Sequence, residues 1–293
     1  MPTIRTENLE VAYESGGPEG GAPLILLHGW PDDVRGWQRS AALLHAKGWR
    51  TFTPYLRGFG PTRFLSPGTI RDGRGVALAQ DAIDLADALK LETFAVAGHD
   101  WGARAAYTLA ALFPERVTRI VGVALAFQPR GAFSLPSFSQ ARRFWYQWFM
   151  MIDDGARAIR ADPKGFARIQ WDTWSPSGWF DETEFEATGR SFENPDWTAV
   201  TLNAYRGRWR PEPGDPRYDT LQARLSEIES LAVPTLMIHG GSDFCDEPAS
   251  SEGMEACFTG PYRRIVLDGV GHFPQREAPE TVAEAMDQHL RNR

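Results

Sequence analysis

One short segment of the sequence carries a side chain that could act as a nucleophile. Residues 98–102 read Gly-His-Asp-Trp-Gly, and the apolar run 94–98 predicts a buried strand that leads into them. The segment that follows, 102–113, is rich in small residues and predicts a helix. A strand that turns sharply into a helix through Gly-x-Asp-x-Gly is typical of a nucleophile elbow, which lifts the central side chain above the sheet. The candidate nucleophile is therefore Asp100.

A carboxylate at this point supports different chemistry from a serine, and no Gly-x-Ser-x-Gly occurs in the sequence. Asp100 is expected to be ionised at neutral pH, so it needs no base to activate it. It can attack a saturated carbon that bears a leaving group, which forms an alkyl ester on the enzyme. Hydrolysis of that ester then requires a base for water and hydrogen-bond donors for the oxyanion.

The base is expected to be a histidine on a loop beyond the last strand, at the same edge of the sheet as the elbow. His272 has this position. The other histidines stand on predicted helices, close strands or flank the nucleophile, and structural roles are predicted for them: His28, His45, His99, His239 and His289. Asp243 follows the fifth predicted strand and precedes His272, which gives the chain order nucleophile, acid, histidine. Asp246 is the weaker candidate for the acid.

Two backbone N–H groups are predicted to bind the oxyanion. The turn His-Gly-Trp-Pro at residues 28–31 follows the first long strand, and its usable donor is the backbone N–H of Trp30. The second donor is the N–H of Trp101, directly after the nucleophile. The two indole side chains are expected to pack around the site.

Short apolar runs rich in branched residues alternate along the chain with longer runs at helical spacing. Strands are predicted near residues 24 and 50 and at 94–98, 119–126, 234–240 and 263–269, and helices at 76–90, at 102–113 and after Pro279. This alternation predicts an α/β fold, a mostly parallel sheet flanked by helices. It places the elbow and both partners of Asp100 at strand ends.

The segment 130–220 breaks this alternation. It holds many tryptophans, is rich in Pro and Asp, and predicts short aromatic helices rather than strands. We expect a helical lid here, inserted into a core domain formed by residues 1–129 and 221–293.

Composition limits the classes of partner. The 293 residues include 31 basic and 38 acidic side chains, for a net charge of -7, and the charges are interspersed, which argues against nucleic acid. No leader or membrane-spanning stretch is recognisable, so the cytoplasm and no membrane association are expected. Cys245 and Cys257 lack metal-ligand spacing, and a disulfide between them is not expected in a reducing compartment. We expect neither a metal nor a cofactor, and the oligomeric state is not predicted.

With these residues assigned, the sequence resembles the epoxide hydrolase and haloalkane dehalogenase branch of the α/β-hydrolase superfamily. The resemblance covers most of the chain and is carried by five features: the turn 28–31, Leu-Arg-Gly-Phe-Gly at 56–60, the elbow 98–102, Asp243 and His272. Both activities of this branch proceed through an aspartyl ester, so the lid must distinguish them.

The resemblance to epoxide hydrolases implies two lid tyrosines that hydrogen-bond the epoxide oxygen as the ring opens. Tyr146 and Tyr205 lie in contexts similar to the family's two tyrosine segments. We therefore predict an epoxide hydrolase that converts an apolar epoxide to a diol. The residues expected to contact the substrate are His28, Pro31, Trp148, Phe149 and Phe273.

Three alternatives remain open at this stage. A haloalkane dehalogenase would cradle the halide with indole N–H groups, for which Trp101 and Trp148 are available. A haloacid dehalogenase is suggested by Arg104, which matches one carboxylate-binding arginine of fluoroacetate dehalogenases, although Trp101 stands where their other arginine is found. Arg104 is otherwise a charge on the helix surface. The third alternative is a small-molecule receptor with this fold that does not turn over its ligand.

Overall fold

The computed structural model describes residues 1–292 and contains one sheet of nine strands. The strand order is β1-β2-β4-β3-β6-β7-β8-β9, with β5 paired to β2. All pairs from β4 to β9 along this order are parallel, whereas β2 pairs antiparallel with β1, β4 and β5. The prediction of a mostly parallel sheet is confirmed. The strands are β1 (Thr3–Arg5), β2 (Leu9–Gly16), β3 (Ala22–Leu27), β4 (Trp49–Pro54), β5 (Arg63–Phe64), β6 (Phe94–His99), β7 (Val117–Val123), β8 (Thr235–Gly240) and β9 (Tyr262–Leu267).

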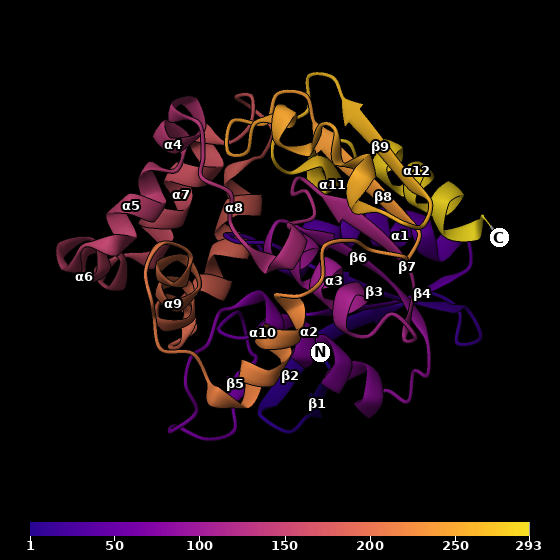
Figure 1. Ribbon diagram of the computed structural model, residues 1–293, viewed down its shortest axis with the longest axis horizontal. Helices are drawn as coiled ribbons and strands as arrows, with labels where there is room; N and C mark the ends of the chain where they lie inside the picture. The colour runs from indigo at the N-terminus through magenta and orange to yellow at the C-terminus, as the bar shows by residue number, and fades with distance from the viewer. Residues whose placement is uncertain (293) are drawn as a thin grey trace.

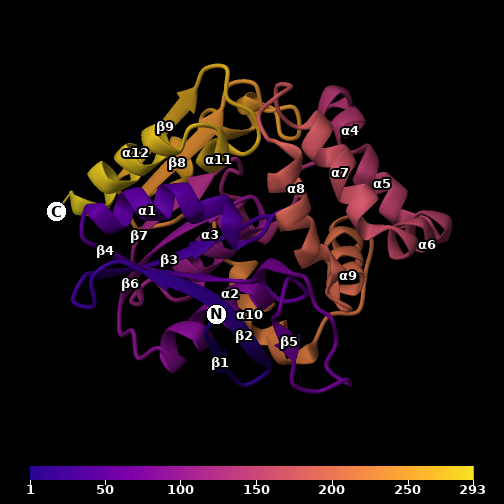
Figure 2. The same ribbon diagram turned by 180° about the vertical axis from the view of Figure 1, so that it is seen from behind.

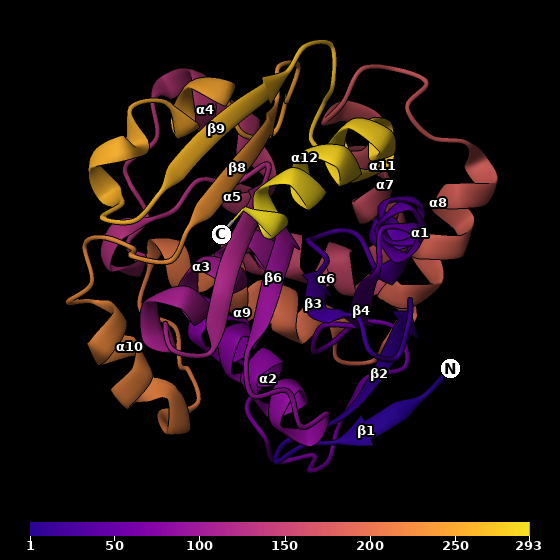
Figure 3. The same cartoon turned by 90° about the vertical axis from the view of Figure 1, so that its right-hand side faces the viewer.

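Helices cover both faces of this sheet (Figure 3). Alternate residues of β3 show the two layers, because Leu24 and Leu26 pack with the helices α1 and α12, whereas Ile25 and Leu27 belong to the apolar cluster that includes α2 and α3. Burial on both faces is the usual state of a parallel sheet. The helices of this part are α1 (Gln38–Ala46), α2 (Gly75–Ala88), α3 (Trp101–Leu112), α11 (Pro274–Glu277) and α12 (Pro279–Arg291).

The chain between β7 and β8 forms seven further α-helices. Figures 1 and 2 show α4 to α9 gathered at one side of the molecule, while α10 lies against the core. The predicted lid boundary at residue 220 falls inside α10, which contacts α3. These helices are α4 (Phe138–Arg143), α5 (Trp145–Met151), α6 (Asp153–Ala161), α7 (Pro163–Thr173), α8 (Glu182–Gly189), α9 (Trp197–Trp209) and α10 (Asp219–Leu225).

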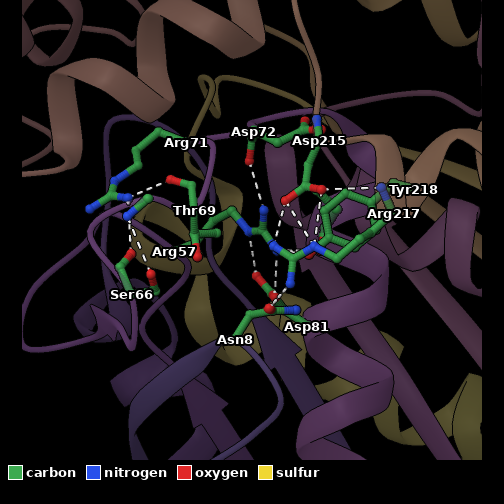
Figure 4. Close-up of polar contacts among 12 residues, drawn as sticks. Asn8, Arg57, Ser66, Thr69, Arg71, Asp72, Asp81, Asp215, Arg217 and Tyr218 are labelled. Carbon is green, nitrogen blue, oxygen red and sulfur yellow. Dashed lines mark hydrogen bonds and ion pairs between the residues drawn. The ribbon is translucent and has the colours of Figure 1, made fainter.

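A buried arginine joins the returning chain after α9 to the core. The Arg57 guanidinium donates to both oxygens of Asp81 at 2.6 Å, to the backbone oxygen of Asp72 at 2.9 Å and to the Tyr218 hydroxyl at 2.9 Å (Figure 4). The Asp72 carboxylate in turn accepts from the backbone N–H of Asp215 at 2.8 Å. Removing any partner of a buried, hydrogen-bonded charge is costly, so this network fixes where the helical segment rejoins the sheet.

The helical segment and the core share one apolar cluster, in which Trp30 packs against aromatic rings from both parts. Its indole stacks near the rings of Trp101, Tyr146 and Trp197, with ring centroids 6.5, 5.6 and 5.9 Å apart. Aromatic pairs at such distances add to the stabilisation from burial alone. The side chain of Trp30 therefore holds the helical segment onto the carboxyl edge of the sheet.

The structure also bears on membrane association. Among residues 1–292, none of the helices combines the length and the apolar character needed to cross a bilayer.

Candidate active site

Asp100 lies at the turn between β6 and α3 with φ 48° and ψ -111°, a conformation that is strained for a residue with a side chain. The turn is possible because its flanking glycines make close approaches. A Cβ on Gly98 would lie 2.0 Å from the backbone oxygen of Gly102, and one on Gly102 would lie 2.2 Å from the backbone oxygen of Leu27. The Gly-x-Asp-x-Gly pattern predicted this elbow, and the contacts explain why both glycines are needed.

The first predicted oxyanion donor contacts the nucleophile. The backbone N–H of Trp30 donates to Oδ1 of Asp100 at 2.8 Å. Trp101 begins α3 directly after the nucleophile, at the end of a helix where backbone N–H groups point outward. One carboxylate oxygen is thus held by a backbone N–H, and the other, Oδ2, lies 3.9 Å from Nε2 of His272.

His272 and Asp243 meet as the chain order predicted. Nδ1 of His272 donates to Oδ2 of Asp243 at 2.7 Å, and Nε2 lies 3.9 Å from Oδ2 of Asp100. Nε2 is buried and has no hydrogen-bond partner among the described residues. Oδ1 of Asp243 accepts from the backbone N–H groups of Cys245 and Asp246 at 2.7 and 2.9 Å. The Asp243 carboxylate is therefore fixed, and it fixes the imidazole with Nε2 facing the nucleophile.

The charges around His272 decide its protonation. Burial alone would lower the pKa of His272, but the carboxylates of Asp243 and Asp100 outweigh it and raise the pKa to about 9. Burial would likewise raise the pKa of Asp243, but the contacts with His272 and His239 lower it. His272 is consequently protonated at neutral pH.

Two residues that the sequence did not single out hold the loop of His272. The Glu277 carboxylate accepts from the backbone N–H groups of Gly271 at 2.6 Å and Phe273 at 2.9 Å, and from the Ser175 hydroxyl at 2.7 Å. The Ser175 oxygen accepts from the backbone N–H of His272 at 2.8 Å. Three consecutive backbone N–H groups are thereby held by one carboxylate and one hydroxyl. Ser175 follows α7, so the helical segment takes part in positioning the histidine.

The two predicted lid tyrosines pack against each other, near enough to Asp100 for its charge to act on both phenols. Tyr146 and Tyr205 are buried, and their ring centroids are 5.4 Å apart at an interplanar angle of 85°. Burial raises the pKa of both phenols well above 10, and the Asp100 carboxylate adds to this effect. Both hydroxyls are therefore protonated at neutral pH and can act as hydrogen-bond donors.

Both hydroxyls accept a hydrogen bond, and the Tyr146 hydroxyl also contacts Sγ of Cys245 at 3.7 Å, where either atom can be the donor. The Tyr205 oxygen accepts from the indole of Trp101 at 3.2 Å, and the Tyr146 oxygen accepts from Nε2 of Gln147 at 3.0 Å. Oε1 of Gln147 accepts from the Trp209 indole at 2.9 Å, which orients the amide with its nitrogen toward Tyr146. Because an indole N–H and an amide NH₂ only donate, each phenol uses a lone pair in these contacts. Gln147 is a positioning residue that the sequence did not reveal.

A cavity of about 500 Å³ opens beside these groups. Asp100, His272 and Tyr146 line it, together with apolar side chains from both parts of the chain. Arg104 also lines this cavity, so it is not the helix-surface charge that was one of its two interpretations. The further apolar lining includes Leu125, Ala126, Phe127, Phe133, Leu135, Phe144 and Cys245.

Tyr205, Trp30 and Trp101 are not part of this lining, and neither are the five residues expected to contact substrate: His28, Pro31, Trp148, Phe149 and Phe273. His28 is fully buried, and both its ring nitrogens bond to backbone, Nδ1 to the oxygen of Gly29 at 2.9 Å and Nε2 to the N–H of Leu56 at 3.0 Å. The carbonyl of Pro31 accepts from the Trp171 indole at 2.7 Å. Both residues hold the turn 28–31 in place.

The three aromatic residues also pack elsewhere. Trp148 is 37% exposed and donates its indole N–H to the backbone oxygen of Ala141 at 2.8 Å. Phe149 packs against Phe166 in the helical segment, and Phe273 stacks on Trp179 with ring centroids 4.4 Å apart. The indoles of Trp101 and Trp148 therefore do not form a halide cradle.

Asp246, the weaker candidate for the acid, donates its backbone N–H to Asp243 and makes no contact with His272 that would orient the ring. Its pKa is raised to about 6 by burial and by Asp243. Cys245 and Cys257 are free thiols. Among residues 1–292, no group of three or more His, Cys, Asp or Glu side chains is placed to hold a metal ion.

Comparison with known proteins gives a family and several similar proteins. A family model described as alpha/beta hydrolase fold matches residues 22–279. The chain belongs to this family. It is 30% identical to epoxide hydrolase 2 of Siraitia grosvenorii, over 96% of this chain and 95% of that protein. It is 29% identical to an epoxide hydrolase of Caballeronia sordidicola, over 93% and 89%. The crystal structure of a candidate epoxide hydrolase from Klebsiella pneumoniae subsp. pneumoniae is similar with a TM-score of 0.92 and 37% identity, over 99% of this chain and 97% of that one.

Proposed function

We propose that this protein is an epoxide hydrolase that converts an epoxide to a vicinal diol through an aspartyl ester. The observation that carries this proposal is the pair of buried phenols, Tyr146 and Tyr205, which stay protonated at neutral pH and whose oxygens accept from Gln147 and Trp101. An epoxide oxygen leaves a carbon readily only when a donor stabilises its developing charge. Residues 130–220 serve in this proposal as the lid that brings these donors over Asp100.

In the first step, Oδ2 of Asp100 attacks one ring carbon while Oδ1 stays on the Trp30 N–H. The new carbon–oxygen bond forms as the ring carbon–oxygen bond breaks, and the electron pair goes to the epoxide oxygen. That oxygen takes a proton from Tyr146 or Tyr205. The products of the step are an alkyl ester on Asp100, a new hydroxyl and a tyrosinate.

Ester formation removes the charge of Asp100, which is one of the two carboxylates that raise the pKa of His272. The pKa of His272 falls as a result, and its proton can pass to the tyrosinate. This transfer regenerates the phenol and leaves Nε2 of His272 as a neutral base. The same histidine is thus a stabilising cation in the resting enzyme and a base after alkylation.

In the second step, Nε2 of His272 takes a proton from a water molecule, whose oxygen attacks the ester carbonyl. The N–H groups of Trp30 and Trp101 stabilise the oxyanion, and Asp243 stabilises the imidazolium. Collapse of the tetrahedral species breaks the ester bond, and the departing alkoxide takes the proton from His272 to complete the diol. The proton left on Asp100 returns to His272, which restores the starting charges.

The substitution His272→Gln tests this sequence of steps. It should leave alkylation possible and stop hydrolysis, so incubation with styrene oxide should add the mass of the epoxide to the peptide that contains Asp100. The double variant Asp100→Asn, His272→Gln is the control and should gain no mass. No adduct on the single variant would refute covalent catalysis at Asp100.

The remaining alternatives are separated by product analysis. The two indoles that a haloalkane dehalogenase would use to bind the halide have other partners, because the Trp101 indole N–H donates to Tyr205 and the Trp148 indole N–H to Ala141. Parallel incubation with an epoxide and a haloalkane decides the point, since halide release without diol formation would overturn the epoxide assignment. Saturable binding with no turnover of either would support a receptor. The proposed setting is the cytoplasm, with a small molecule and water as the only partners.

A further inference from the structure

A buried arginine joins the two loops that carry the proposed base and the proposed oxyanion donor. Arg276 lies on α11, four positions after His272, and is 4% exposed. Its guanidinium donates to both carboxylate oxygens of Asp32, from Nη2 to Oδ1 at 2.6 Å and from Nε to Oδ2 at 3.1 Å. Asp32 is fully buried and stands two positions after Trp30, whose N–H holds the nucleophile. The pair therefore connects the loop of the base with the turn of the oxyanion donor.

The same guanidinium is also bound by the helical segment. Nη1 forms an ion pair with the carboxylate of Glu184, and Nη2 donates to the Thr188 hydroxyl at 3.1 Å. Both residues lie on α8, which faces α11 where the helical segment meets the core (Figure 2). The guanidinium carbon lies 4.9 Å from the ring centroid of Trp171 on α7. Arg276 thus contacts the core on one side and two helices of the segment 130–220 on the other.

The guanidinium and the Asp32 carboxylate both keep their charges in this buried position. Burial lowers the pKa of Arg276, but the contacts with Asp32 outweigh burial and raise the pKa above the usual value of an arginine. Burial likewise raises the pKa of Asp32, and Arg276 lowers it by more. A guanidinium holds a carboxylate through two parallel N–H groups, so this ion pair fixes direction as well as distance.

The turn that carries Trp30 is tied closely to Asp32. Oδ1 of Asp32 accepts from the backbone N–H of Asp33 at 2.7 Å, and the backbone N–H of Asp32 donates to the backbone oxygen of Gly29 at 3.2 Å. A Cβ on Gly29 would lie 2.6 Å from the Cβ of Asp100, so the turn passes directly against the nucleophile. A shift of Asp32 therefore changes the contact between the Trp30 N–H and Asp100.

The loop of His272 depends on Arg276 from the other side. The helix α11 contains only four residues, and the backbone N–H of Arg276 donates to the backbone oxygen of Phe273 at 2.8 Å. Because a helix this short has little stability of its own, side-chain contacts must fix its position. The Trp30 N–H lies at Oδ1 of Asp100, and Nε2 of His272 lies nearest Oδ2. Arg276 consequently sets the spacing between the base and the oxyanion donor.

We propose that Arg276 is a positioning residue, which aligns the base with the oxyanion donor only while α8 is docked on it. This inference rests on the proposed function, because it concerns the second step of that reaction. Hydrolysis of the ester requires Nε2 of His272 and the N–H of Trp30 to act at the same carbonyl. Ring opening requires no base. Docking of the helical segment is therefore coupled to ester hydrolysis, in addition to its role in presenting the tyrosines.

The substitution Glu184→Gln tests the link from α8. It keeps the size of the side chain and replaces a charge-assisted hydrogen bond by a weaker one. In single turnovers with styrene oxide, ester hydrolysis should slow by about tenfold and alkylation by no more than about twofold, so the ester on Asp100 should accumulate. Glu186→Gln makes the same change on α8 at an exposed pair with Lys164, and it should alter neither rate. Equal slowing of the two steps, or no slowing, would overturn the inference.

Variants of Arg276 show whether the link passes through its side chain. Lysine keeps the charge but lacks the fork of N–H groups, so hydrolysis in Arg276→Lys should slow by about tenfold or more. The double variant Glu184→Gln, Arg276→Lys should be no slower than Arg276→Lys alone, because the link is already broken. Additive losses would show that Glu184 acts without Arg276 and would overturn the inference.

A further variant covers the case in which Arg276→Lys does not fold. Asp32→Asn, Arg276→Met removes both charges of the buried pair together, so neither is left without its partner. Its ester hydrolysis should also slow by about tenfold or more, with alkylation little changed. A rate of hydrolysis like that of the wild type would reduce the pair to a structural contact and contradict the inference.

A spectroscopic readout does not depend on turnover. Nδ1 of His272 donates to Asp243 at 2.7 Å, and this proton should give a low-field NMR signal whose position responds to the geometry of the contact. Glu184→Gln should shift the signal, whereas Glu186→Gln should leave it in place; an unshifted signal in Glu184→Gln would overturn the inference. If the wild type hydrolyses no epoxide, the proposed function fails, and this signal alone decides whether α8 positions His272.

Discussion

Replacing Glu277 by glutamine should separate the two chemical steps, although Glu277 does not touch the substrate. The Glu277 carboxylate accepts from Gly271, Phe273 and Ser175, and Ser175 accepts from the backbone N–H of His272. Glutamine keeps one acceptor oxygen and puts an NH₂ group where the other oxygen was. That NH₂ group would face a backbone N–H, so one hydrogen bond is lost and two donors are opposed.

The magnitude follows from this count. A hydrogen bond to a charged acceptor is worth about 1.5–3 kcal/mol, so the free energy of unfolding should fall by about that amount. The loop then shifts, and a displacement of about 1 Å at a catalytic group can cost about a hundredfold in rate. His272 acts as the base only in the second step, so ester hydrolysis should slow by up to this factor while alkylation stays close to the wild-type rate.

Single-turnover mass spectrometry of the peptide that contains Asp100 measures both rates. Glu277→Gln should accumulate the ester, whereas Glu280→Gln, the same charge change at an exposed position on α12, should not. Urea titration gives the change in unfolding free energy. Equal slowing of alkylation and hydrolysis, or an ester population like that of the wild type, would refute the positioning role of Glu277.

Three further predictions concern the same site. Tyr205→Phe should slow alkylation by about a hundredfold or more, measured as the first step of a single turnover, and an unchanged rate would remove Tyr205 from ring opening. Trp148→Phe should change kcat/KM by no more than about twofold, as expected for a residue outside the cavity. Because the folded state raises the pKa of His272 from 6.5 to about 9, the stability from this contact is complete below pH 6.5 and is lost as the pH rises toward 9. At 1.36 kcal/mol per pKa unit this amounts to about 3 kcal/mol, and urea titrations across this range should show the loss in the wild type and not in His272→Gln.

The sequence predicted the elbow and its partners because each depends on local pattern and chain order. Asp100 stands in a five-residue motif, and Asp243 and His272 follow identified strands. The lining of the cavity was not predictable in this way. The helix α5 reads Trp-Tyr-Gln-Trp-Phe-Met-Met, and this nearly continuous apolar run does not tell which side faces the cavity. Tyr146 faces it, whereas Trp148 and Phe149 do not.

Contacts across long sequence separations account for the other missed residues. Ser175 and Glu277 are 102 positions apart, and their roles exist only once the helical segment is folded onto the sheet. His28 appears available in the sequence, but both its nitrogens are used by backbone groups. The strands β1 and β2 were not predicted either, because β1 has only three residues and the buried and exposed positions of β2 do not alternate regularly.

Trp30 joins two requirements in one residue. Its backbone N–H holds the nucleophile, and its indole packs against aromatic rings of both the helical segment and the core. A chimera that exchanged residues 130–220 for those of a relative would have to match this indole before it could offer a new specificity. New specificities of this enzyme are therefore expected to arise through substitutions of side chains that line the cavity. The docking of the lid cannot change freely, because it depends on the same residue that supplies the oxyanion donor.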